Sequence, residues 1–311
     1  EYDAQGRVTL EYNLGLDGKP ILSGNGYAGV RRTYTNAQRS PSMETYLDAA
    51  LEPIDLAAGY AAVERTYDEK GYTLSESYLN AAGESAAYYN TYARVEREYN
   101  AQGRMTCERY YAADRVPMRV SSGYHMLRRE YDAQGRMTFE RYYDEQGASV
   151  LCQSGYAALQ RAYTEQGSVS GENYFGTDEE PILCTRGYAG FEREYDADGR
   201  TVLERYLGTD GAPMASTSGY ACVRRTYEQN GDRVEERYYD ETDALTDCLR
   251  GYAILRQEKE NGRPVREAYF NTEDEPVNSQ SGYSVTERSY DAQGRMSHEI
   301  CYDVDGAVVR E

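Results

Sequence analysis

Residues 123–154 read "GYHMLRREYDAQGRMTFERYYDEQGASVLCQS", and this stretch decides the fold because the rest of the chain repeats it. The phrase "YDAQGRMT" at 131–138 returns as "YDAQGRVT" at 2–9, "YNAQGRMT" at 99–106 and "YDAQGRMS" at 290–297. Self-similarity at a fixed spacing is the signature of a repeat architecture. The question is whether the phrase performs chemistry or builds shape.

The length of the repeat follows from the spacing of a second phrase, "GYA" and its variants. Its tyrosines are Tyr27, Tyr60, Tyr92, Tyr124, Tyr156, Tyr188, Tyr220, Tyr252 and Tyr283, and successive spacings lie between 31 and 33 residues. We predict a single continuous repeat domain over 1–311, a segment of a longer protein, with about nine to ten copies. The units begin near residues 26, 59, 91, 123, 155, 187, 219, 251 and 282.

The sequence of each unit predicts a β-hairpin followed by a third short strand. The extended runs 124–131 and 136–143 flank the turn "DAQG", and a second turn, "DEQG", precedes the apolar piece "ASVL". Asp at the start of such a turn bonds its own backbone, and Gly at the end supplies a positive φ. A 32-residue unit cannot bury its own face, so neighbouring units must stack. The predicted fold is therefore all-β: an elongated solenoid or superhelical sheet of tandem β-hairpin repeats.

Comparison of the copies reveals columns of constant residues. An Arg stands two residues before the first Tyr position of each unit's hairpin, except where Gln257 replaces it. A Glu stands two residues before the second Tyr position, which is Cys301 in the last copy. Arg stacks on Tyr while bonding a carboxylate, so these columns are either a row of binding sites or a structural spine. The candidate binding residues are Tyr142, Tyr174, Tyr206, Arg129, Arg161, Arg193, Glu140, Glu172 and Glu204.

The columns also select a strand register. If "DAQG" is a four-residue loop, Tyr131 lies opposite Arg136, and Leu127 lies opposite Glu140. Arg129 is then diagonal to Glu140, within reach of long side chains. Because strand residues alternate faces, the constant residues share one face and the variable residues share the other.

Composition excludes several function classes. The net charge of −19 argues against a nucleic-acid surface, since phosphate binding needs clustered positive charge. No apolar run is long enough for membrane insertion. No Ser-His-Asp group, Cys-His group or phosphate loop is present, so we expect no enzyme activity, no cofactor and no metal site. The Asp-x-Asp-Gly phrases that begin at Asp196 and Asp303 are interpreted as turns.

Three cysteines, Cys152, Cys184 and Cys248, share one column near the "GY" loop. Ser23, Ser216 and Ser279 occupy the same column. Cys152 and Cys184 lie in adjacent units, so they either form a disulfide or serve as small residues under a turn.

The phrase "YDAQGRMT" resembles the YD repeat of the Rhs family, which reads Tyr-Asp-x-x-Gly-Arg, an apolar residue and Thr. That resemblance covers about eight residues per unit and implies β-hairpin sheets that spiral into shells on bacterial and animal surface proteins and toxins. The Tyr-rich hairpins are also similar in style to cell-wall and glucan-binding repeats of Gram-positive bacteria.

Two functions follow from these patterns. The first is a noncatalytic bacterial surface repeat, extracellular or on the cell surface, that binds a glycan or cell-wall polymer through multivalent Tyr-rich faces. The alternative is a structural spacer or a scaffold for protein–protein interaction in a large surface or toxin protein. Its partners would contact the variable face, which includes Met137, Phe139 and Leu203.

Overall fold

A computed structural model describes residues 1–35, 39–228 and 231–311. The chain forms two compact units, 1–153 and 154–311, and each is considered by itself. Both units are built from antiparallel β-strands, with only two short 3-10 turns, Tyr88–Asn90 and Ala113–Arg115, among the described residues. None of the helical turns in the described part of the chain is long and apolar enough to cross a membrane. The prediction of one continuous domain stays a prediction.

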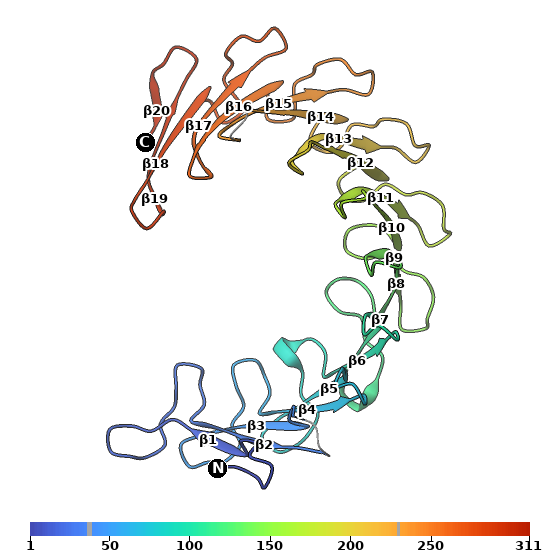
Figure 1. Cartoon of the computed structure of the whole chain (residues 1–311), viewed down its shortest axis with the longest axis vertical. Coiled ribbons are helices and arrows are strands. Elements are labelled where there is room, and N and C mark those ends of the chain that lie inside the picture. The colour runs from blue at the N-terminus through green and yellow to red at the C-terminus, as the bar shows by residue number, and fades with distance from the viewer. Residues whose placement is uncertain (36–38, 229–230) are drawn as a thin grey trace. The chain divides into compact units, whose positions relative to one another are not determined.

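In the first unit, strands β1 to β9 follow one another in chain order, and each pairs with its sequence neighbours (Figure 1). Their bounds are β1 Leu10–Tyr12, β2 Gly29–Thr33, β3 Met43–Leu47, β4 Ala62–Tyr67, β5 Thr73–Leu79, β6 Arg94–Tyr99, β7 Met105–Tyr111, β8 Met126–Tyr131 and β9 Met137–Tyr143.

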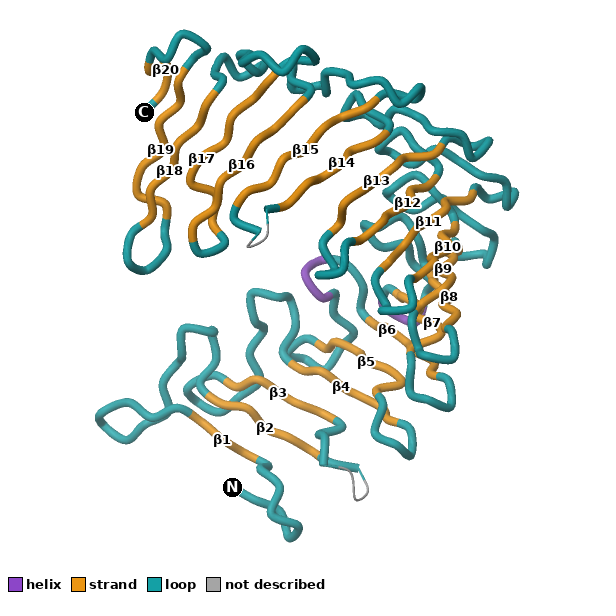
Figure 2. Tube along the Cα trace, turned by 45° about the horizontal axis from the view of Figure 1, so that its top comes forward, coloured by secondary structure: helices purple, strands orange, loops and turns teal. Residues whose placement is uncertain are grey.

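The second unit continues the same plan, and Figure 2 shows its strands running side by side between loops. The bounds are β10 Ala158–Tyr163, β11 Val169–Phe175, β12 Gly190–Tyr195, β13 Thr201–Leu207, β14 Cys222–Tyr227, β15 Arg233–Tyr239, β16 Ile254–Glu260, β17 Arg263–Phe270, β18 Val285–Tyr290, β19 Met296–Tyr302 and β20 Val308–Arg310. The all-β hairpin-repeat prediction is therefore confirmed.

The predicted register is wrong by two residues. In the β8–β9 hairpin, Leu127 lies opposite Tyr142 and Arg129 lies directly opposite Glu140. A bulge between Glu130 and Tyr131 absorbs the difference. A shift of two residues keeps every side chain on its original face, so Leu127, Arg129, Glu140 and Tyr142 still share one face.

The turn explains the shifted register. The Asp132 carboxylate accepts a 2.8 Å hydrogen bond from the Arg136 main-chain N–H, and the Asp132 N–H donates to the Arg136 carbonyl at 3.0 Å. These bonds draw Arg136 into the turn, so it does not lie opposite Tyr131. Gly135 closes the turn with φ +83°, a conformation that glycine adopts without steric cost.

The third strand of each unit is mostly a single bridge. Tyr143 bridges Ser149 and Phe175 bridges Pro181, for example, whereas only β20 extends this segment into a strand among the described residues. After the bridge the chain turns back in a loop toward the next "GY" phrase.

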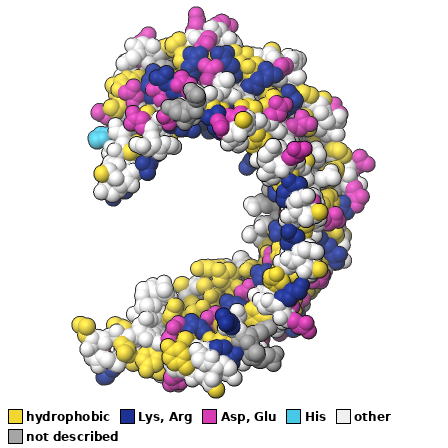
Figure 3. All heavy atoms as spheres, viewed as in Figure 1, with side chains coloured by type: hydrophobic (Ala, Val, Ile, Leu, Met, Phe, Trp, Pro, Cys, Tyr) yellow, Lys and Arg dark blue, Asp and Glu magenta, His cyan; other side chains and the backbone are white. Residues whose placement is uncertain are grey.

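Buried side chains lie on both faces of the hairpins: Leu127 and Tyr142 on the constant face, and Leu47, Leu203 and Ile254 on the variable face. The residue after each "GY" tyrosine is buried, and Ala61, Ala157 and Ala253 are 0% exposed. One cluster in the second unit joins Val223, Tyr238 and Tyr269 of the strands to Cys248 and Tyr252 of a loop. The interior therefore combines small apolar residues with tyrosine rings. Charged side chains of both signs are interspersed on the surface in view (Figure 3).

Candidate binding face

The constant Arg donates to the constant Glu of its own hairpin, and in the β16–β17 hairpin Gln257 takes the place of the Arg and donates to Glu267. The Nε of Arg193 lies 2.6 Å from Glu204, and the Nε of Arg161 lies 2.6 Å from Glu172. Arg129 makes the same bond to Glu140, whose side chain is buried. Direct cross-strand pairing, rather than the expected diagonal one, places each guanidinium opposite its carboxylate.

The constant Tyr completes a three-residue cluster with this pair. Tyr174 donates its hydroxyl proton to Glu172 at 2.9 Å, and Tyr206 donates to Glu204 at 2.6 Å. Tyr142 makes the same bond to Glu140. These three tyrosines are only 6%, 6% and 9% exposed, so most of each ring is packed against neighbouring side chains. The arrangement favours a structural spine, and ligand binding by the nine candidate residues stays a prediction.

The clusters also join adjacent repeats. In the first unit Arg65 donates to Glu76 of its own hairpin at 3.2 Å and to Glu44 of the preceding one at 2.6 Å. Arg97 likewise bridges Glu108 and Glu76, both at 2.7 Å. Arg288 in the second unit repeats the pattern. Alternating Arg and Glu thus form one ladder from Glu11 to Glu108 in the first unit and a shorter one from Glu267 to Glu299 in the second.

The ladder determines the protonation of its carboxylates. Burial alone would raise the pKa of Glu44, but hydrogen bonds from Arg65 and Arg32 outweigh it, and the pKa lies below its usual value. The pKa of Glu76 is also below its usual value, because hydrogen bonds from Arg97 and Arg65 outweigh the effect of burial. Both carboxylates are therefore held in the charged form that the ladder needs.

Tyrosine rings form a second ladder beside the charged one. Rings from the "GY" phrases alternate with rings from the second strands, as in Tyr188 against Tyr206 at 4.5 Å between centroids and Tyr206 against Tyr220 at 5.8 Å. Offset and tilted pairs at these distances stabilise by about 0.5–1.5 kcal/mol beyond their burial.

The repeated phrase of the first turn connects repeats in both directions. Tyr195 donates its hydroxyl proton to the Val169 carbonyl, 26 residues earlier, at 2.6 Å. Arg200 bonds Asp196 within the turn at 2.7 Å and places its guanidinium 4.8 Å from the ring centroid of Tyr227 in the next repeat. The Asp196 phrase, which has the Asp-x-Asp-Gly pattern, is thus a turn, and Asp196 accepts the backbone N–H groups of Asp198 and Arg200.

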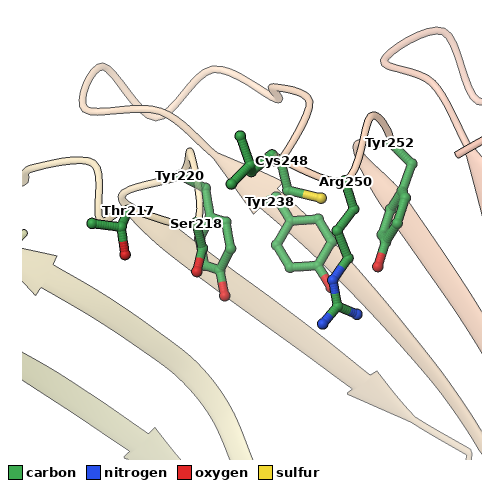
Figure 4. A pocket seen from close by; sticks show the side chains of 8 residues that line it. Thr217, Ser218, Tyr220, Tyr238, Cys248, Arg250 and Tyr252 are labelled. Atoms are coloured by element: carbon green, nitrogen blue, oxygen red, sulfur yellow. The ribbon is translucent and has the colours of Figure 1, made fainter. Parts of the chain in front are cut away.

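Two arginines outside the constant columns were missed by the sequence reasoning. Arg186 and Arg250 lie in "GY" loops and line cavities between tyrosine rings, the second of which is drawn in Figure 4. Column comparison could not select them because the position varies: four repeats carry Ser there, and others carry Asn or Ala. Their signal was their departure from the pattern, in loops that otherwise carry small polar residues.

The cysteines and a possible metal site are the remaining candidates for chemistry. Cys152 and Cys184 are both free thiols, as are the other four cysteines, and Cys184 and Cys248 are buried under their turns. This agrees with their interpretation as small residues equivalent to Ser. Within residues 1–35, 39–228 and 231–311, no group of three or more His, Cys, Asp or Glu side chains is arranged to hold a metal ion.

These features define the class: a Tyr-rich, all-antiparallel β-hairpin repeat protein. No family model matches the chain, and no curated protein matches it. Among solved structures, the chain is similar to a component of the Photorhabdus luminescens Tc holotoxin pore, with a TM-score of 0.26 and 11% identity. The match covers 98% of this chain and 17% of that one, and at this TM-score it defines neither a family nor a function.

Proposed function

We propose that the chain is a noncatalytic structural repeat, a spacer or protein-interaction scaffold in a larger bacterial surface or secreted protein. One observation carries this proposal: the constant Arg, Glu and Tyr side chains bond one another within and between repeats. At Arg65, Arg97 and Arg288 the recurring residues are thereby used to stack a unit on the preceding one. The resemblance of the "YDAQGRMT" phrase to Rhs-type YD repeats supports the same role.

The variable face is then the surface that distinguishes one repeat from another. Strand residues that alternate with the ladder, such as Met137 and Glu130, differ from copy to copy. Because these residues differ between copies, each repeat can make different contacts with a partner, while the constant residues keep the same contacts between repeats. We propose that protein partners are recognised on this face.

Modular deletion tests the spacer role. Removal of 187–218, one full period from one "GY" glycine to the residue before the next, preserves every stacking contact in phase. We expect a cooperatively folded protein with a smaller hydrodynamic size. Removal of 187–202, half a period, serves as the control and should abolish cooperative unfolding of the second unit. If the full-period deletion unfolds like the half-period one, the spacer proposal is wrong.

Binding of a carbohydrate or cell-wall polymer is the second function that we propose. It is favoured by a specific observation: the "GY" loops of the second unit enclose surface cavities lined by tyrosine rings, hydroxyl groups and Arg. A glycan array probed with the whole chain tests it, and the absence of any signal would count against it.

A further inference from the structure

Two cavities in the second unit are built from the same residues. The Arg250 cavity has a volume of about 240 Å³, and its lining includes Ser218, Tyr220, Tyr238, Cys248, Arg250 and Tyr252. Each of these six has the same residue type 64 positions earlier, and those earlier residues line the Arg186 cavity of about 190 Å³. The site therefore occurs twice, two repeats apart.

The spacing of the tyrosine ladder accounts for the cavities. Within a repeat the rings are close, with 4.7 Å between the centroids of Tyr220 and Tyr238. Between repeats they are farther apart, with 5.8 Å from Tyr238 to Tyr252. The loops above hold this gap at a fixed width, since the Leu249 N–H donates to the Ser218 carbonyl at 2.7 Å. The Thr185 N–H makes the same bond to Ser154 in the earlier cavity.

Arg is special to these two loops. Both arginines stand directly before the Gly of a "GY" phrase, where the other repeats carry Asn25, Ala58, Asn90, Ser122, Ser154, Ser218 and Ser281. The Arg250 carbonyl accepts the Gln280 N–H at 2.8 Å, and the Arg186 carbonyl accepts the Thr217 N–H at 2.8 Å. These bonds fix the main chain from which each Arg side chain extends to its cavity.

The guanidinium groups are available to a ligand. Arg186 and Arg250 are exposed, and in the described residues neither has a carboxylate within ion-pair distance. Hydrogen bonding to the Tyr252 hydroxyl raises the pKa of Arg250, and Tyr188 does the same for Arg186. Figure 4 shows the Arg250 guanidinium and the hydroxyls of Tyr220 and Tyr252 pointing to the same side. Most of the five guanidinium N–H donors are left for an incoming anion.

Size and chemistry select the ligand. Both cavities are smaller than the about 300–1,000 Å³ typical of drug-sized ligands, so each fits a single ring. Tyrosine rings and hydroxyls suit a sugar, and Arg binds carboxylate through paired hydrogen bonds. The protein's net charge of −19 disfavours a densely charged anionic polymer as the ligand. The acidic sugars of the glycan should therefore be separated by neutral sugars.

We propose that the Arg186 and Arg250 cavities each bind one acidic sugar residue, a carboxylate-bearing pyranose of a glycan, with the carboxylate on the guanidinium. This inference rests on the second function proposed above and specifies its site and ligand class. Two such sites on one rigid array would raise the avidity for a polymer beyond that of either site.

A site-resolved NMR titration tests it. The probes are methyl glucuronide, its neutral counterpart methyl glucoside, and acetate, and the readout is the Nε–H resonances of Arg186 and Arg250. For so small a ligand we expect a Kd of about 1 mM for the glucuronide, with both resonances shifting. The glucoside and acetate should each bind at least about tenfold more weakly, because each lacks one half of the recognised chemistry.

The variants use residues that the chain already carries. Arg250→Ser should remove one site and leave the Arg186 resonance responsive, and the double variant with Arg186→Ser should lose glucuronide binding. Arg295→Ser is the charge-matched control, since that side chain is 76% exposed and lies in a turn, and it should bind as the parent does. Circular dichroism confirms that each variant folds.

Three results overturn the proposal: equal binding of glucoside or acetate, no shift of either resonance with about 20 mM glucuronide, or binding unchanged in the double variant. If one of these three results is found and the chain still binds neutral glycans on an array, carbohydrate binding stands and only the acidic-sugar sites are wrong. If no glycan binds parent or variant, the second function fails as well, while the spacer role is judged by the deletions alone.

Discussion

The hydroxyl of Tyr195 donates a 2.6 Å hydrogen bond to the carbonyl oxygen of Val169, 26 residues earlier in the preceding repeat. The same bond, with the same separation, links Tyr99 to Thr73 and Tyr227 to Thr201. The tyrosine that opens each turn therefore fastens that turn to the unit before it. This contact explains why the phrase recurs: it is the connection between repeats.

Replacing Tyr195 by Phe removes this bond and leaves the ring in place. The Val169 carbonyl loses its side-chain partner, so we expect the free energy of unfolding to fall by about 1 kcal/mol. Urea unfolding followed by circular dichroism measures it. Tyr2→Phe is the control, because Tyr2 is 72% exposed, and it should change stability by less than about 0.5 kcal/mol. Equal effects of the two substitutions would show that the hydroxyl bond contributes nothing.

Glu76 holds two arginines from different repeats, Arg65 and Arg97. Glu76→Gln keeps the shape but leaves both half-buried guanidinium groups without their shared charge. We expect a loss of about 2 kcal/mol in unfolding free energy. Glu69→Gln makes the same chemical change at an exposed position of the same unit and should be nearly neutral. A Glu76→Gln protein as stable as Glu69→Gln would mean that the ladder is not a stabilising element.

Much of this ladder was visible in the sequence, and the reason is periodicity. Copies of one unit reveal which residues face the interior, and Arg129, Glu140 and Tyr142 were grouped correctly because strand residues alternate faces. Their pairing was missed because it depends on one bond: the Asp132 side chain captures the N–H of Arg136 and shifts the register by two. The third strand was overestimated because the segment 148–151 forms only one bridge before the loop.

The cavities at Arg186 and Arg250 could not be predicted from columns. They depend on how the loops stack between repeats, as in the bond from the Leu249 N–H to the Ser218 carbonyl, and the residue columns do not show such contacts. The sequence showed only that two loops carry Arg where the others carry small or polar residues.

Acid should weaken the first unit through its ladder. The pKa values of Glu44 and Glu76 lie below their ordinary value of 4.5 in the folded chain. A lowered folded pKa gives stability that is complete above the unfolded pKa and is lost as pH falls through the folded one. Unfolding free energy should therefore be constant down to about pH 4.5 and then decrease. The Glu76→Gln protein should show a shallower decrease, and an identical pH profile would contradict this assignment.

Alkali should act through the tyrosine ladder. Burial first, then neighbouring charges, raises the pKa of Tyr60, Tyr124 and Tyr269 to about 12, from an ordinary value of 10. A raised folded pKa gives stability that is complete below the unfolded pKa, so it should be lost between about pH 10 and 12. Phenolate absorbance should show exposed tyrosines ionising first and buried ones together with loss of the sheet signal. Ionisation of all tyrosines in one step with the sheet intact would refute this.

The stacked loops around the cavities should make one glycine of the second unit much less tolerant of Ala than another. Gly211 and Gly219 both have positive φ, +77° and +85°, so Ala at either position carries the same backbone cost of about 1 kcal/mol. A Cβ at Gly211 meets nothing within 4 Å, whereas one at Gly219 would lie 2.9 Å from the main-chain nitrogen of Leu249. That nitrogen already donates to the Ser218 carbonyl at 2.7 Å and cannot move away without breaking the contact between the loops.

Gly219→Ala should therefore destabilise the protein by at least about 1 kcal/mol more than Gly211→Ala in parallel urea titrations, and it should weaken glucuronide binding at the Arg250 cavity. Equal destabilisation by the two substitutions would show that the loops yield freely, and a cavity with such yielding walls would not select its ligand by shape.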